Sequence, residues 1–113
     1  MFDALKNLGN LPGLMAKARE MQEKMAAMQE ELGRKTVTAD SGGGIVEATC
    51  NGRRELVRIR IDKSRFDVND TEMLEDLIVA AVRAAEDKAA DLAKSEMQRV
   101  AGEMGLPPGM LPS

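Results

Sequence analysis

The sequence predicts an α+β fold in which a long helix is followed by a three-stranded antiparallel sheet and a second long helix. Three observations predict it. Apolar residues recur at steps of three and four between residues 11 and 32, the period of a helix packed along one side. Residues 36 to 62 instead alternate apolar and polar side chains, as strands with one buried face do. Residues 70 to 103 contain many strong helix formers, no proline and one glycine.

The first helix is expected between about residues 11 and 32. Its apolar stripe comprises Leu14, Ala18, Met21, Met25, Met28 and Leu32. This spacing predicts packing along the length of another helix. We interpret the methionines as core filling and not as a groove for foreign peptides. Gly33 is expected to end the helix, and residues 1 to 10 are expected to be a flexible N-terminus.

Three strands are expected between residues 36 and 62. The predicted buried face carries Val37, Ala39, Val46, Ala48, Cys50, Val57, Ile59 and Ile61. The other face is open to solvent or to a partner and carries Thr36, Thr38, Glu47, Thr49, Arg58 and Arg60, with Ile45 and Leu56 as exceptions. Cys50 has no disulfide partner, so we expect it to be inert packing in a reducing compartment.

Glycine-containing turns separate the strands. Residues 42 to 44 are three glycines, which adopt positive φ freely, and the Asn-Gly pair at 51 and 52 is a strong hairpin signal. A two-residue loop pairs Val46 with Val57, and a four-residue loop pairs Val46 with Ile59. A three-residue loop mixes the faces and is disfavoured. The glycines do not form a phosphate-binding loop, because the Lys-Ser/Thr of a P-loop is absent and a strand follows.

The second helix is expected to begin after Asn69, which with Glu72 forms a variant of the capping box. About 34 helical residues span about 51 Å, longer than a compact chain of this size allows. The helix must therefore protrude or lie on a second subunit. Its first half is apolar on more than one stripe, which predicts a homodimer. The expected interface residues are Leu77, Ile78, Ala81 and Val82.

The composition restricts the function. The 113 residues suffice for one domain, and residues 104 to 113 are expected to be a flexible Pro/Gly tail. The absence of His, Trp and Tyr removes imidazole chemistry, the usual zinc ligands and most aromatic stacking on bases. We expect no enzymatic activity, metal or cofactor. The longest apolar run has six residues, too short to cross a membrane, and no signal peptide is recognisable.

Basic side chains on the two helices are candidate contacts to phosphate groups. Several pairs are seven or eleven residues apart, spacings that return to nearly the same side of a helix. The set is Lys17, Lys24, Arg83, Lys88, Lys94 and Arg99. One alternative is that these cations pair with neighbouring acidic residues. The other is that phosphates contact the basic sheet edge, formed by Arg53, Arg54, Arg58 and Arg60.

Six collinear segments lie at residues 21–25 (MQEKM), 28–32 (MQEEL), 44–48 (GIVEA) with the Asn-Gly pair, 57–62 (VRIRID), 72–77 (EMLEDL) and 106–109 (LPPG). In order and spacing they resemble the YbaB/EbfC family of bacterial nucleoid-associated proteins. The resemblance implies a homodimer whose helices project like tweezers and that binds double-stranded DNA in the cytoplasm, at the nucleoid. The six helix cations are then candidate DNA contacts. The alternative function is an adaptor for recombination or replication proteins.

Overall fold

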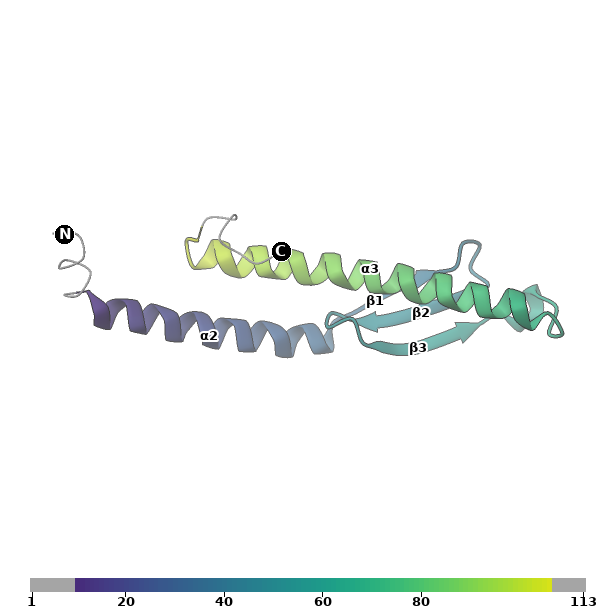
Figure 1. Ribbon diagram of the computed structural model, residues 1–113, viewed down its shortest axis with the longest axis horizontal. Helices are drawn as coiled ribbons and strands as arrows, with labels where there is room; N and C mark the ends of the chain where they lie inside the picture. The colour runs from purple at the N-terminus through teal and green to yellow at the C-terminus, as the bar shows by residue number, and fades with distance from the viewer. Residues whose placement is uncertain (1–9, 107–113) are drawn as a thin grey trace.

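The computed structural model describes residues 10 to 106 and confirms the predicted order of elements (Figure 1). Along the sequence, one long helix precedes the three strands and another follows them. The elements are α2 (Leu11–Arg34), β1 (Thr36–Asp40), β2 (Val46–Asn51), β3 (Leu56–Ile61), the 3-10 helix η1 (Lys63–Arg65) and α3 (Thr71–Glu103). Residues 1 to 9 of the predicted N-terminal segment and residues 107 to 113 of the predicted tail lie outside the described residues.

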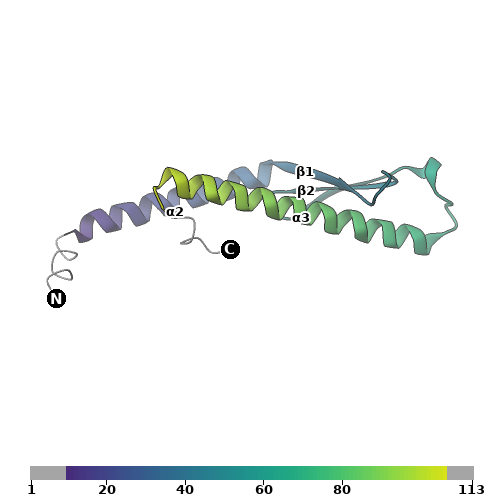
Figure 2. The same cartoon turned by 90° about the horizontal axis from the view of Figure 1, so that it is seen from above.

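The molecule is elongated and has two layers. Its extents are 74 × 23 × 17 Å and its radius of gyration is 21.2 Å, whereas a compact chain of this length has a radius of gyration of about 13 Å. The first half of α3 runs along one face of the sheet, and its second half runs beside α2 (Figures 1 and 2). Helix α2 therefore continues the layer of the sheet. Neither helix between residues 10 and 106 is long and apolar enough to cross a membrane.

The sheet has the strand order β1-β2-β3, with both pairs antiparallel. Val46 pairs with Ile61 and Ala48 pairs with Ile59, so both predicted registers, Val46 with Val57 or with Ile59, are wrong. The turn has the three-residue loop that the alternation disfavoured. Asn51 N donates to Glu55 O at 2.9 Å, and Arg54 has a positive φ of 65°, as in a type I turn followed by a left-handed residue.

A bulge in β3 explains how a three-residue loop keeps the apolar faces together. Thr49 pairs with Arg58 but Cys50 pairs with Leu56, so Val57 is an extra residue without an opposite partner. This insertion shifts the strand by one residue and returns Ile59 to the buried face. Val57 itself, which the alternation placed in the core, is 57% exposed.

One hydrophobic cluster lies between the sheet and the first half of α3. Ala81, Ala85 and Ala89 follow each other at intervals of one helical turn and are fully buried, which lets the helix lie close to the strands. They cover the buried strand residues Ala39, Val46, Ala48 and Cys50. The prediction that Cys50 is buried is thus confirmed, and this burial raises the pKa of its thiol.

A second cluster joins α2 to the second half of α3. Its buried members are Met28, Leu32, Val100 and Met104, and its half-buried members include Met21, Met25, Leu92 and Met97. The predicted helix-to-helix seam is confirmed over this length. The stripe residues Leu14 and Ala18 are exposed, because the N-terminal part of α2 extends past the end of α3 (Figure 1).

The β2–β3 turn docks on the C-terminal end of α2. Gly52 N donates to Leu32 O at 2.8 Å and to Lys35 O at 3.0 Å. A Cβ atom on Gly52 would lie 2.7 Å from Leu32 Cδ2, so this glycine is required by close approach and not by its φ angle. The Asn51 side chain shapes the same turn, since its Oδ1 accepts from Arg53 N at 2.9 Å and from Glu55 N at 3.1 Å.

The ends of α3 differ from the sequence prediction. The N-cap is Asp70 and not Asn69, because the Asp70 carboxylate accepts from Met73 N at 3.1 Å and the helix begins one residue later than expected. At the other end Gly105 has a φ of 69°, and Leu106 N donates to Ala101 O at 2.8 Å, which is a Schellman cap. Residues 104 to 106, which were assigned to the tail, form this cap.

Candidate nucleic-acid interface

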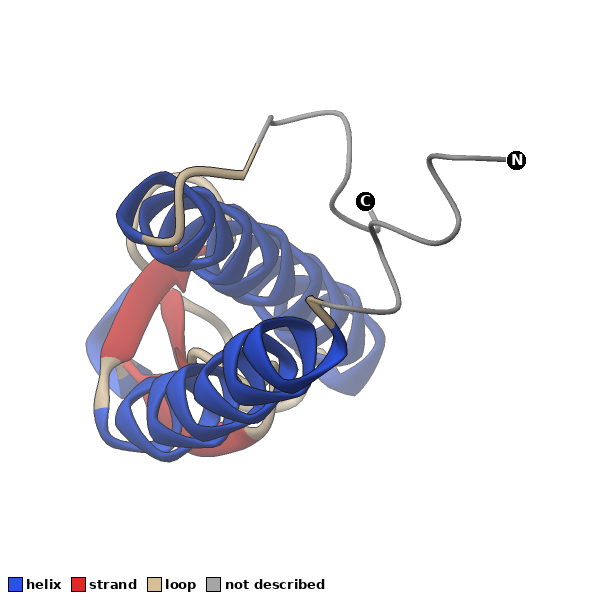
Figure 3. Ribbon diagram, turned by 90° about the vertical axis from the view of Figure 1, so that its left-hand side faces the viewer, coloured by secondary structure: helices blue, strands red, loops and turns tan. Residues whose placement is uncertain are grey.

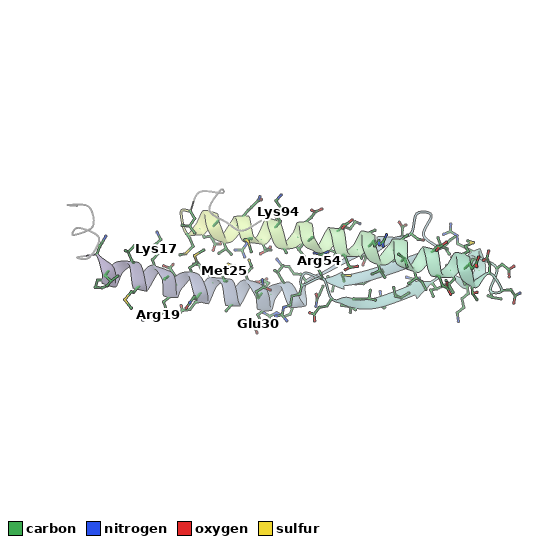
Figure 4. The ribbon with its side chains drawn as sticks, in the orientation of Figure 1. Lys17, Arg19, Met25, Glu30, Arg54 and Lys94 are labelled. Atoms are coloured by element: carbon green, nitrogen blue, oxygen red, sulfur yellow. The ribbon has the colours of Figure 1, made fainter. Side chains whose placement is uncertain are left out.

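Three of the six predicted helix cations are exposed and free. Lys17 lies on α2, and Arg83 and Lys94 lie on α3. None of them makes an ion pair or a side-chain hydrogen bond with the part of the chain that the structure describes. Figure 4 shows Lys17 and Lys94 on the two neighbouring helices, with Met25 between them in the helix-to-helix seam. Long cationic side chains in this state are available to phosphates.

The other three cations are already engaged. Lys24 Nζ lies 3.4 Å from Glu103 Oε2, and Arg99 Nη1 lies 2.7 Å from Glu103 Oε1. Lys88 Nζ donates to Thr38 O at 2.9 Å and so ties α3 to β1. The alternative of pairing with acidic residues thus holds for Lys24 and Arg99, and a phosphate must displace an existing contact to reach any of the three.

Glu96 is a charged contact between the two helices. Its carboxylate accepts from Lys35 Nζ at 2.9 Å and from Arg99 Nη2 at 2.9 Å, and the side chain is 12% exposed. The hydrogen bond from Lys35 is the main cause that lowers the pKa of Glu96, and the hydrogen bond from Arg99 is the second. The hydrogen bond between Arg99 and Glu96 also raises the pKa of Arg99. Sequence reasoning missed the Lys35 contact, because the two residues are 61 positions apart and neither belongs to a motif.

The predicted dimer residues divide between two sides of α3. Ala81 is fully buried beneath its own sheet, whereas Leu77, Ile78 and Val82 are half-buried at its margins. Val79 faces outward and is 49% exposed, and its neighbour Ala80 is exposed as well. Figure 3, a view along the long axis, shows the ends of α2 and α3 in front, with the strands further back.

The alternative basic edge is only partly free. Arg53 is a structural residue, because its Nε donates to Gln29 O at 2.8 Å and its guanidinium lies against Gly33. Arg54, Arg58 and Arg60 are exposed and make no side-chain hydrogen bond or ion pair among residues 10 to 106. Arg54 lies at the turn between β2 and β3 (Figure 4).

Comparison with known proteins matches most of the chain to one protein family. The model of the YbaB/EbfC DNA-binding family matches residues 7–104. A nucleoid-associated protein of Moorella thermoacetica is 45% identical over 100 residues, which cover 88% of this chain and 96% of that protein. A nucleoid-associated protein of Desulfotalea psychrophila is 44% identical over 94 residues, which cover 83% and 89%.

The fold also has a counterpart in a crystal structure. An uncharacterized protein from Helicobacter pylori superposes with a TM-score of 0.57 at 26% identity, over 69% of this chain and 90% of that chain. Family model, relatives and fold agree, and the chain therefore belongs to the YbaB/EbfC DNA-binding family.

Proposed function

We propose that the protein binds double-stranded DNA as a homodimer at the nucleoid and contributes to nucleoid organisation or gene expression. The observation that carries this proposal is membership of a DNA-binding family over residues 7–104. The names of the relatives from Moorella thermoacetica and Desulfotalea psychrophila, both nucleoid-associated proteins, support the cellular setting.

Binding rests mainly on phosphate contacts from the helices. The chain has no Trp or Tyr to stack on bases, and within residues 10 to 106 neither of its helices of 24 and 33 residues belongs to a helix-turn-helix unit with a short recognition helix. Lys17 and Lys94 are the first contacts, because they are exposed and free. Arg83 is also exposed and free among the described residues, but it lies one helical turn after Val79 and so contacts DNA at the margin of the dimer interface. Lys24, Lys88 and Arg99 contribute after releasing their present partners. Affinity that comes from counterion release is insensitive to sequence and sensitive to salt.

The homodimer forms through the outward side of the first half of α3. Val79 supplies exposed apolar surface there, and Leu77, Ile78 and Val82 supply its half-buried margins. Ala81 lies between α3 and the sheet and supports the interface indirectly, because its small side chain lets the helix lie close to the strands. A shared α3 interface leaves both α2 arms of the dimer free to contact a duplex.

Two lysines on α2 offer a matched test of the phosphate contacts. Lys17→Gln removes a free cation and Lys24→Gln removes a cation paired with Glu103, so the net charge changes equally. We expect Lys17→Gln to weaken binding to unrelated duplexes and to flatten the slope of log K against log salt by about one per contact. We expect Lys24→Gln to have the smaller effect. Equal affinities and slopes for both variants and the wild type would exclude these helix contacts and favour the adaptor function.

A further inference from the structure

We infer that the uncovered face of the sheet is a second contact surface for the DNA backbone, centred on Arg58 and Arg60. This sheet surface comprises Arg58 and Arg60 of β3 with Thr38 of β1 and Thr49 of β2. The inference rests on the proposed DNA binding and adds a surface on the side of the sheet opposite to α3.

The strand register places these side chains together. Ile59 and Ile61 pack on the cluster beneath α3, so Arg58 and Arg60, which alternate with them, point to the other face. Arg58 lies opposite Thr49, and Thr49 Oγ1 lies 3.1 Å from Thr38 Oγ1. Arginine and threonine side chains are common donors to phosphate oxygens in protein–DNA complexes.

The charge of the chain is concentrated around this face. Residues 35 to 65 hold seven basic and four acidic residues, whereas α3 holds four basic and eight acidic residues and α2 holds four of each. A duplex is therefore repelled least, and attracted most, at the sheet. The net charge of −3 for the whole chain does not reveal this uneven distribution of basic and acidic residues.

Most of the acidic residues near the sheet are already bound by turns. Asp40 accepts from Gly42 N at 3.2 Å, Glu55 accepts from Asn51 Nδ2 at 2.9 Å, and Asp62 accepts from Ser64 Oγ at 2.6 Å. The Ser64 hydrogen bonds lower the pKa of Asp62, and the charges of Arg65 and Arg60 lower it further. Two acidic strand residues share the open face with the arginines: Glu47 lies opposite Arg60, and Asp40 lies opposite Glu47.

A hollow at the end of the sheet adds Lys63 to the cations of this surface. Arg60 and Lys63 line a shallow hollow together with Gly44, Glu47, Ile61, Asp62 and Ser64. This hollow prolongs the line of cations beyond Arg58. β-Sheets contact DNA in several known binding modes, so a row of cations along one strand is a suitable seat for a phosphate backbone.

A second copy of the chain fits this face poorly. Stable homodimer interfaces are more apolar than the rest of the surface, and the paired strand residues of this face are mainly arginines, threonines and the two acidic residues Asp40 and Glu47. The surplus of basic residues in and beside the strands, seven against four acidic between residues 35 and 65, favours the DNA backbone as the occupant.

The double variant Arg58→Gln/Arg60→Gln in the full chain tests the inference. We expect it to flatten the slope of log K against log salt by about two and to weaken duplex binding on the order of tenfold at 0.1 M salt. Arg19→Gln/Arg34→Gln is the matched control, because it removes two exposed arginines from α2. It should flatten the slope less than the double variant, because Arg34 is already paired with Glu30. Glu47→Gln removes one of the two acidic residues on the face, the one opposite Arg60, and should tighten binding.

The outcomes separate the sheet surface from the proposed function. If the double variant is folded and binds like the wild type while Lys17→Gln weakens binding, the sheet surface is wrong and helix-based DNA binding stands. Equal losses in the double variant and its control also contradict the inference, because the effect is then one of total charge. If the double variant changes the sedimenting mass, the face is an interface between copies. If the wild type shows no salt-dependent duplex binding, the proposed function itself fails.

Discussion

At the scale of single residues, the fold depends on a few close contacts that cannot accept a change of shape. Gly52 is the clearest case. Its amide holds the β2–β3 turn to α2, and its missing side chain leaves space for Leu32, whose carbonyl oxygen would lie 2.8 Å from an added Cβ atom. Because the β2–β3 turn also fixes the register of β3, the Gly52 contact affects the pairing of the sheet.

Gly52→Ala should therefore destabilise the protein by about 1 to 3 kcal/mol, the usual cost of overpacking a rigid site. Gly102 is the control, because a Cβ atom there meets nothing within 4 Å and the position is helical. Gly102→Ala should be neutral or stabilising by about 0.5 to 1 kcal/mol. Chemical denaturation measures both, and equal stability of the two variants would show that the turn does not dock as described.

Cys50 is a buried packing residue, and its substitution tests that role. Cys50→Ala should fold, lose roughly 1 kcal/mol of stability for a small cavity, and retain duplex affinity. The raised pKa of the thiol also predicts slow reaction with thiol reagents in the folded protein. Loss of DNA binding in a fully folded Cys50→Ala variant would instead place the sulfur near the contact surface.

At the scale of elements, α2 and α3 are joined by a hydrophobic seam and by the charged contact at Glu96. The lowered pKa of Glu96 means that its carboxylate is stabilised in the folded state, chiefly by Lys35. Its contribution is fully present above the ordinary value near 4.5 and is lost as pH falls through the lowered folded value. The contact therefore makes the packing of the helices sensitive to acid.

Glu96→Gln should reduce the loss of stability between pH 7 and about pH 3, because the neutral amide cannot titrate. Glu23→Gln is the control, since Glu23 is exposed on α2 and makes no ion pair among the described residues. Denaturation curves at the two pH values give the comparison. A Glu96→Gln protein with the same acid sensitivity as the control would show that the Lys35 contact does not form in solution.

The elements themselves were predictable from the sequence, and the details of their joining were not. Periodicity gave both helices and three strands because each buries one face. The bulge at Val57 was not predictable, since Leu56 and Val57 are both apolar and either can fill the alternation. Asn69 and Asp70 are equally good caps, so the sequence could not choose between them. Which cations are free depends on acidic partners distant in sequence, such as Glu103 for Lys24.

At the scale of the whole molecule, the long α3 helix is the element that can join two chains. Its inner side is covered by the sheet and by α2, and its outer side carries Val79. An extended molecule of 74 Å then becomes one half of a two-armed particle. We therefore propose that the dimer, and not the single chain, is the unit that binds DNA.

Val79→Asp should dissociate the dimer without unfolding the chain, because the side chain is exposed in the single subunit. Ala81→Asp should unfold it, because that side chain is fully buried under the sheet and an unpaired buried charge is very costly. Sedimentation equilibrium and circular dichroism distinguish the two results. A Val79→Asp protein that retains the mass of the wild type would exclude this side of α3 as the interface.

The most direct test of the central claim is the salt dependence of binding by the unmodified protein to two duplexes of unrelated sequence. If a dimer neutralises about six phosphates, log K should fall with log salt at a slope near about −5, with the same slope and similar affinity for both duplexes. An affinity that is independent of salt, or that is confined to one of the two sequences, would contradict binding through the DNA backbone.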